Sequence, residues 1–137
     1  MSESIIYLAL GDSLTAGYGA PPGRGFVDVY RMLAEQRLQK PVTVLNKGVN
    51  GARTNQVLQQ LRSKKTLKND VRKASLITIT AGGNDMLDAA RTFLAQKDTK
   101  NILRTIRSCK RTYQEMLQFI FRCKKGHAQA YQITIAN

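Results

Sequence analysis

Short apolar segments alternate with longer amphipathic segments along the chain. Residues 5–10 and 76–80 are runs of apolar and β-favouring side chains that lead into glycine, and residues 42–45 form a shorter apolar run after Pro41. Residues 130–136 place Tyr and two Ile side chains alternately with polar ones. These four segments predict four strands.

Between the strands, apolar side chains recur at the spacing of an α-helix. Residues 25–39 and 101–124 repeat them at intervals of three, four and seven, and Gly126 follows the second of these segments. Residues 55–61 start another amphipathic helix, which we expect to continue into the basic stretch around Lys64. The segment 101–124 predicts one long helix lying on a sheet.

Strands that alternate with helices predict an α/β fold, a three-layer α/β/α sandwich with an open parallel sheet. We expect residues 1–137 to form a single domain. Three polar, glycine-bearing segments, 11–19, 46–54 and 82–85, each follow a predicted strand. Because ligands bind at the carboxyl ends of parallel strands, these segments predict a site at one edge of the sheet.

The chain is strongly basic, with 22 Lys and Arg residues against 9 acidic residues and a formal charge of +13. The cations concentrate in 62–73, 104–111 and 122–125, where they alternate with apolar helix positions. We interpret them as solvated helix faces that allow peripheral contact with an anionic membrane surface. A nucleic-acid module is a weaker alternative, because charge is its only support, and no specific nucleic-acid site is predicted.

The sequence also favours a cytoplasmic location. Residues 5–10 lack a basic leader and a small-residue cleavage site, and no run approaches the roughly 20 apolar residues of a membrane span. Cys109 and Cys123 would lie roughly 21 Å apart in one helix, which is too far for a disulfide between them. Unpaired cysteines fit a reducing compartment.

Three residues in the polar segments offer the chemistry of a hydrolytic site. Ser13, in Gly-Asp-Ser-Leu-Thr, lies where a nucleophile would face the cleft, or it caps the following helix. Gly51 would offer a bare backbone N–H to a substrate oxygen, or it is a plain turn glycine. Asn84, in Gly-Gly-Asn-Asp, offers a side-chain amide, or it caps a local turn.

Taken together, these segments resemble the first three sequence blocks of the SGNH, or GDSL, hydrolase superfamily. Gly-Asp-Ser-Leu at 11–14 resembles the nucleophile block, Asn-x-Gly-x-x-Gly at 46–51 the second block, and Gly-Gly-Asn-Asp at 82–85 the third. The details of these blocks look closest to the spore-associated SGNH lipases of bacilli.

The resemblance implies a flavodoxin-like parallel sheet and a serine lipase or esterase. Ser13 would be the nucleophile, and the amides of Ser13 and Gly51 with the Asn84 side chain would form the oxyanion hole. The substrate would be a small-molecule or lipid ester, and spore association is implied only by this likeness. No cofactor or metal is implied, and Asp85 and Asp88 alone do not make a metal site.

The chain departs from the superfamily in one block. The Asp-x-x-His block, whose histidine is the general base, is absent, and the lone histidine, His127, precedes a predicted strand and so falls at the wrong edge. We therefore expect an SGNH domain that is incomplete at its C-terminus, truncated after its fourth strand, with little or no esterase activity.

One further expectation concerns the sheet edge, and one alternative concerns the function. The fourth strand would leave an uncovered sheet edge through which chains could associate. A non-catalytic ligand-binding protein on the same scaffold is the alternative to an esterase.

Overall fold

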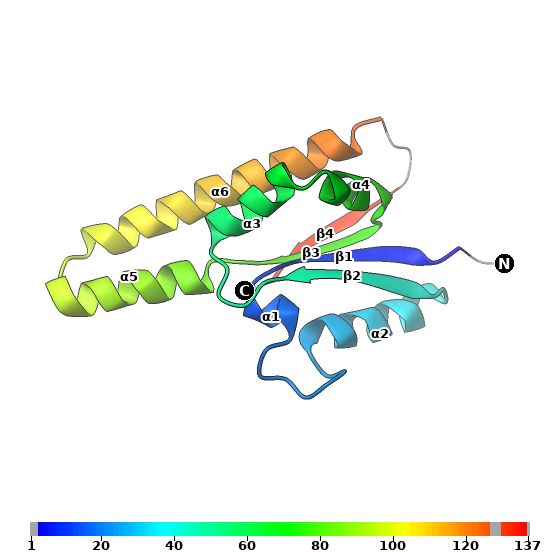
Figure 1. The fold of residues 1–137 in the computed structure, drawn as a ribbon, viewed down its shortest axis with the longest axis horizontal. Coiled ribbons are helices and arrows are strands. Elements are labelled where there is room, and N and C mark those ends of the chain that lie inside the picture. The colour runs from blue at the N-terminus through cyan, green and yellow to red at the C-terminus, as the bar shows by residue number, and fades with distance from the viewer. Residues whose placement is uncertain (1–2, 127–129, 137) are drawn as a thin grey trace.

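The computed structural model describes residues 3–126 and 130–136. Its centre is one parallel sheet with the strand order β2-β1-β3-β4 (Figure 1). The strands are β1 (Ile5–Gly11), β2 (Val42–Gly48), β3 (Leu76–Thr80) and β4 (Gln132–Ile135). The strand order confirms the flavodoxin-like parallel sheet.

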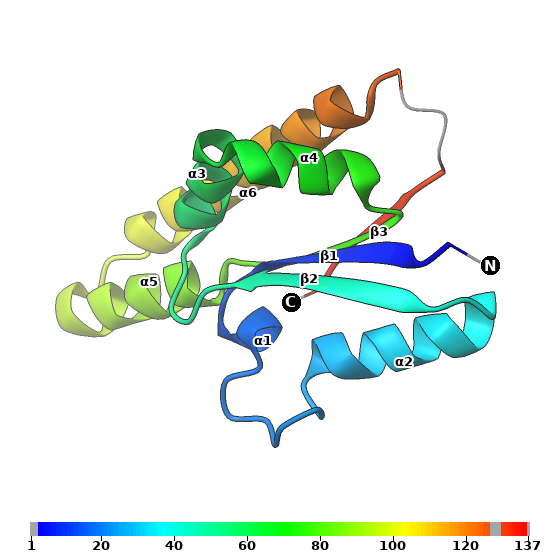
Figure 2. The same cartoon turned by 45° about the vertical axis from the view of Figure 1, so that its right-hand side comes forward.

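Helices cover both faces of this sheet, which gives the three predicted layers (Figures 1 and 2). The helices are α1 (Ser13–Ala16), α2 (Phe26–Leu38), α3 (Thr54–Ser63), α4 (Lys65–Lys73), α5 (Gly83–Gln96) and α6 (Lys100–Lys124). The first two helices lie on one face, and α3, α4 and α6 lie on the other. Over residues 3–126 and 130–136, no helix combines the length and apolarity needed to cross a bilayer.

The alternation of side chains along β1 builds two separate cores. Leu8 and Leu10 point to the face covered by α3, α4 and α6, where they join Met116 and Ile120. Tyr7 and neighbouring apolar residues point to the opposite face, against α2. These side chains are fully buried, and each large one contributes about 2 kcal/mol to folding.

The central position of β1 decides where the polar segments meet. β1 pairs with β2 on one side and with β3 on the other, in parallel register through Gly11, Gly48 and Thr80. The three polar segments therefore all leave the sheet at the carboxyl ends of its strands, as predicted. Within the described residues β4 pairs only with β3, so it forms one of the two sheet edges.

The structure corrects three expectations about the helices. The backbone is extended at Lys64, so the predicted helix after Asn55 is two helices, α3 and α4. Residues 83–96 form α5, which the sequence pattern did not predict because its first turn reads as a glycine-rich loop. The long helix α6 lies on the sheet only through its second half, since its first half packs against α5 beyond the sheet edge (Figure 1).

The two cysteines lie in α6, as predicted, and both are free thiols. Cys123 is buried and Cys109 is half-buried. Burial raises the pKa of both thiols. Neither thiol therefore has the lowered pKa that activates a cysteine as a nucleophile.

Candidate active site

Ser13 is the first residue of α1, and only Asp12 separates it from the end of β1. The N-cap is Asp12, whose Oδ1 accepts a hydrogen bond from the Leu14 N–H at 3.0 Å. The Ser13 carbonyl accepts the backbone N–H groups of Gly17 and Tyr18, each at 3.0 Å. Ser13 therefore does not cap this helix, and its half-buried side chain stays available at the sheet edge.

A buried polar cluster lies under the Ser13 turn. The Thr80 hydroxyl donates to Asp12 Oδ1 at 2.9 Å, and it lies 2.7 Å from the Thr15 hydroxyl, which donates to the Leu10 carbonyl. The three side chains are at most 5% exposed. Because buried polar groups are costly when unpaired, this cluster fixes the turn relative to the end of β3.

Gly11 has no room for a side chain at this point. A Cβ there would lie 2.1 Å from the Thr80 hydroxyl, and its φ of +147° is unfavourable for other residues. The glycine that precedes Asp12 therefore lets β1 and the Thr80 side chain approach each other closely.

The second polar segment is joined to the Ser13 turn by backbone and side-chain bonds. The Val49 N–H donates to the Gly11 carbonyl at 2.9 Å, and Asn46 Nδ2 donates to the Thr15 carbonyl at 2.7 Å. Gly48 lies against α1, because a Cβ there would lie 2.3 Å from the Ala16 nitrogen. The first and second segments therefore form one rigid unit.

Gly51 lies in a tight turn that exposes its backbone. The Ala52 N–H closes the turn by donating to the Val49 carbonyl at 3.1 Å, and Gly51 has a φ of +80°. That φ lies in the left-handed region, which favours glycine. The N–H of Gly51 donates to no described residue, so it is free for a ligand.

Asn84 connects the third segment to the second. It lies in the first turn of α5, and its Nδ2 donates to the Ala52 carbonyl at 2.9 Å, next to Gly51. A local turn cap would have bonded within residues 82–85, so that interpretation is wrong. An amide nitrogen carries two protons, and the second remains available beside the Gly51 turn.

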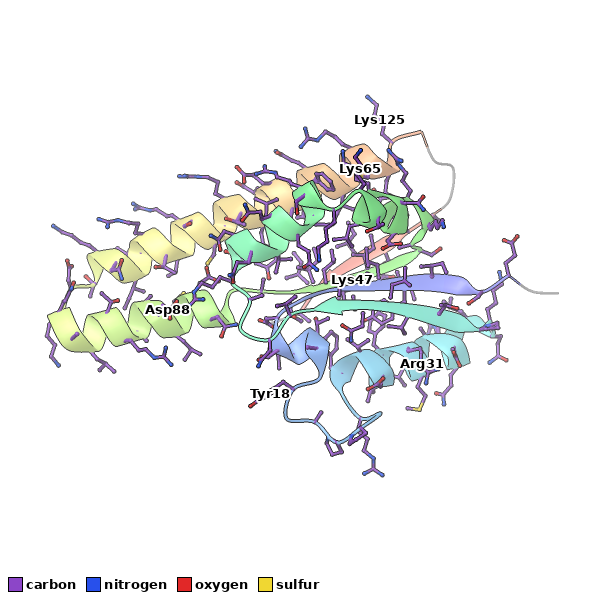
Figure 3. The ribbon with its side chains drawn as sticks, in the orientation of Figure 1. Tyr18, Arg31, Lys47, Lys65, Asp88 and Lys125 are labelled. Atoms are coloured by element: carbon purple, nitrogen blue, oxygen red, sulfur yellow. The ribbon has the colours of Figure 1, made fainter. Side chains whose placement is uncertain are left out.

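Asp85 and Asp88 make further bonds between the same two segments. Asp85 accepts the Thr54 N–H at 3.0 Å and the Thr54 hydroxyl at 3.1 Å, at the start of α3. Asp88 pairs with Arg53 at 2.6 Å, and this hydrogen bond holds the pKa of the Asp88 carboxyl below its usual range. Figure 3 shows Asp88 on α5. The described residues contain no cluster of three or more potential metal ligands.

All three candidate residues therefore lie at one edge of the sheet, on segments that hydrogen bonds tie to one another. The profile of the GDSL-like lipase/acylhydrolase family matches residues 9–133, which include all three segments. The chain belongs to this family.

Individual relatives of the family agree with this assignment. The spore germination lipase LipC of Bacillus licheniformis is 33% identical over 132 residues, which are 96% of this chain and 62% of LipC. The crystal structure of the lipase Lip_vut3 from a goat rumen metagenome has a TM-score of 0.92 and 32% identity. That match covers 98% of this chain and 64% of Lip_vut3, so the chain spans less than two thirds of these relatives.

A second solved structure is less similar. AlinE4, an SGNH-hydrolase family esterase, has a TM-score of 0.66 and 25% identity, over 98% of this chain and 59% of AlinE4. The assignment to the SGNH, or GDSL, hydrolases and to the three-layer α/β fold is thus confirmed.

Within this family site, Ser13 lacks a partner among the described residues. Its hydroxyl makes no hydrogen bond to any of them. The one histidine of the sequence, His127, lies outside the described residues. The prediction that His127 does not act as the base therefore stays a prediction.

Three residues that support the site from below were not predicted from the sequence. Thr15, Asn46 and Thr80 bond across segments that are far apart in the chain. Thr80 lies in a β-rich run, where threonine is ordinary, so the sequence carries no signal for its role. Thr15 and Asn46 lie in the first and second polar segments, but their sequence positions do not indicate the bonds that they make.

Proposed function

We propose that this protein is a serine ester hydrolase that acts through Ser13. The Ser13 Oγ would attack the acyl carbon of an ester, and the backbone amides of Ser13 and Gly51 with the Asn84 side chain would form the oxyanion hole. The observation that carries the proposal is the Asn84 Nδ2 bond to the Ala52 carbonyl, which holds the Asn84 amide beside the Gly51 turn.

The chemistry follows from these groups. Attack by Ser13 needs a base to take the hydroxyl proton, and it places negative charge on the former carbonyl oxygen. Preorganised N–H donors stabilise that oxygen without reorganising, so a fixed Gly51 turn is suited to the task. The alcohol then leaves, and water hydrolyses the acyl-enzyme.

We also propose that the chain 1–137 by itself has little or no activity. The sequence contains no Asp-x-x-His, and the described residues place no base beside Ser13. An enzyme that has lost a triad member still accelerates the reaction roughly a thousandfold over the rate in water, because the oxyanion hole and substrate binding remain. We regard residues 1–137 as one SGNH domain that depends on a base from outside this chain.

The substrate class, location and association of the protein are proposals of the same kind. A small-molecule or lipid ester fits the family, and the similarity to LipC, a spore germination lipase, supports a link with spores. A cytoplasmic location stays a prediction. Association through the open edge of β4 is supported by Ile135, which is 45% exposed there.

A fluorophosphonate probe tests the role of Ser13 directly. We expect slow labelling of Ser13 that mass spectrometry locates, no labelling in Ser13→Ala, and unchanged labelling in the control Ser63→Ala, which removes an exposed serine on α3. Added imidazole should raise the labelling rate in proportion to its concentration, because it replaces the absent base.

A further variant tests the oxyanion hole. Asn84→Ala should lower the imidazole-dependent rate with an aryl ester by roughly a hundredfold. The parent chain should show no comparable rate without imidazole. If imidazole-dependent hydrolysis is absent while a fatty-acid ester still binds, the chain is instead the non-catalytic ligand-binding protein.

A further inference from the structure

The first half of α6 carries a dense cluster of cations that no described acidic group neutralises. Between Asp88 and Glu115 the sequence holds seven Lys and Arg residues and a single acidic residue, Asp98. The Asp98 carboxylate accepts the Lys100 N–H at 2.9 Å at the start of the helix. Arg91 lies 3.7 Å from Asp88, and the other six cations have no ion pair with a described residue.

Several of these cations share one exposed surface with apolar side chains. Helical spacing of three, four and seven residues places them along one side of α6, where a hollow of about 580 Å³ lies among four of the cations, Leu103 and Ser108. We call this surface the basic face. Its residues are Lys100, Leu103, Arg104, Ile106, Arg107, Lys110 and Arg111.

The apolar members of the basic face are exposed. Leu103 is 53% exposed and Ile106 is 48% exposed, although both lie among cations. A helix that carries cations beside exposed Leu and Ile side chains is typical of binding at the surface of an anionic bilayer. The cations bind lipid headgroups, and the apolar side chains enter the boundary of the acyl chains.

The same features disfavour nucleic acid as the partner. Residues 94–112 contain no aromatic side chain on which a base could stack. The nearest aromatic residue on α6, Tyr113, donates its hydroxyl to the Ala81 carbonyl at 2.6 Å and so points toward the sheet.

The position of the basic face relates it to the candidate active site. α5 begins at the carboxyl edge of the sheet, next to Asn84, and α5 and the first half of α6 extend beyond that edge (Figures 1 and 2). Leu14 and Tyr18, which follow Ser13, are also exposed at that edge, by 57% and 74%. The basic face and the candidate active site therefore both lie toward the carboxyl end of the sheet.

We propose that the basic face docks this protein on anionic lipid surfaces, near the end of the sheet where lipid esters would reach the Ser13 site. The proposal rests on the proposed function for its substrate, but the docking step itself depends only on the basic face. The total charge of the chain favours anionic partners without indicating which surface binds them, whereas this proposal assigns the contact to the basic face.

The test is sedimentation with vesicles of phosphatidylcholine and about one quarter phosphatidylserine. The parent chain should bind these vesicles, and binding should weaken steeply with salt. The variant Lys100→Gln/Arg107→Gln/Lys110→Gln/Arg111→Gln should lose at least about a hundredfold in vesicle affinity, since each cation contributes about fivefold.

A matched control variant has the same total charge as the first variant, but the four cations that it removes lie elsewhere. Lys64→Gln/Lys65→Gln/Lys73→Gln/Lys125→Gln removes four exposed cations outside the basic face, at the other end of the molecule, where Figure 3 shows Lys65 and Lys125. This control should retain most of the vesicle affinity. Leu103→Ser/Ile106→Ser should lose roughly tenfold and retain its salt dependence.

Three outcomes would overturn the inference. They are absence of vesicle binding by the folded parent chain, an equal loss in the control variant, and tighter binding to duplex DNA than to vesicles. Fluorophosphonate labelling of Ser13 separates this proposal from the proposed function, because labelling without vesicle binding refutes only the docking. Vesicle binding without labelling, even with imidazole, refutes only the hydrolase.

Discussion

The two halves of α6 have similar apolar spacing and different surroundings. In the second half, Met116 and Ile120 are fully buried against the sheet and the helices α3 and α4. In the first half, Leu103 and Ile106 are about half exposed, since α5 is the main element that packs there. Apolar periodicity thus identifies a helix, whereas burial depends on what lies next to each turn.

The cations of the two halves also differ in burial. Lys124, near the end of α6, is 4% exposed, and its Nζ donates to the carbonyls of Ala74 and of Arg72, the latter at 3.0 Å. Burial lowers the pKa of Lys124. Its ammonium group closes the end of α4, whereas the cations of the basic face remain in solvent.

The largest effect that we expect concerns two glycines. Gly11→Ala places a Cβ 2.1 Å from the Thr80 hydroxyl at a φ of +147°, and it should lower the free energy of unfolding by about 4 kcal/mol. Gly83→Ala, at the first position of α5, has no atom within 4 Å of the new Cβ and should change it by less than about 1 kcal/mol. Urea unfolding measures both. Equal losses would mean that the end of β1 is no more tightly packed than the start of α5.

The next effect separates the two halves of α6. Ile120→Ala should cost about 3 kcal/mol, because it opens a cavity in the core. Ile106→Ala, the same change at a position that is 48% exposed, should cost less than about 1 kcal/mol. Both are measured by urea unfolding. A cost for Ile106→Ala that matches Ile120→Ala would contradict the exposure of the first half and remove Ile106 from the basic face.

A smaller effect concerns a buried and an exposed tyrosine. Burial raises the pKa of Tyr7 to about 12, above its ordinary value of 10.0, so the native state holds the phenol proton more tightly than the unfolded state does. The stability from this difference is fully present below pH 10 and is lost as pH rises toward 12.

The measurement for the tyrosines is the free energy of unfolding as a function of pH above neutrality. Over the alkaline range, the free energy of unfolding of Tyr7→Phe should fall by about 2 kcal/mol less than that of the parent chain. Tyr18→Phe, at a side chain that is 74% exposed, should follow the parent chain. Parallel curves for all three proteins would refute the assignment to Tyr7.

The smallest effect compares the two carboxylates of α5. Asp85→Ala removes the acceptor for the N–H and hydroxyl of Thr54, which is 2% exposed, and should cost about 1 kcal/mol. Asp88→Ala breaks only its exposed ion pair with Arg53 and should leave the thermal midpoint unchanged within error. Thermal unfolding distinguishes them, and a larger loss from Asp88→Ala would show that the ion pair holds the two segments together.

Much of this fold could be predicted from local patterns. β3 has the predicted bounds, and β1 and α2 differ from prediction by one residue at each altered end. The polar segments that contain Ser13, Gly51 and Asn84 each follow a strand, and parallel strands bring such segments to one edge. The sequence alone therefore determined which segments form the candidate site.

Tertiary structure decided how those segments are held and which helix turns are buried. The Asn84 bond to the Ala52 carbonyl and the contact of Thr80 with Asp12 join residues more than thirty positions apart, so no periodicity records them. The exposure of Ile106 likewise depends on the position of α5 beyond the sheet edge. Periodicity reports the local backbone geometry of a segment, whereas hydrogen-bond partners and burial depend on segments that only the folded chain brings together.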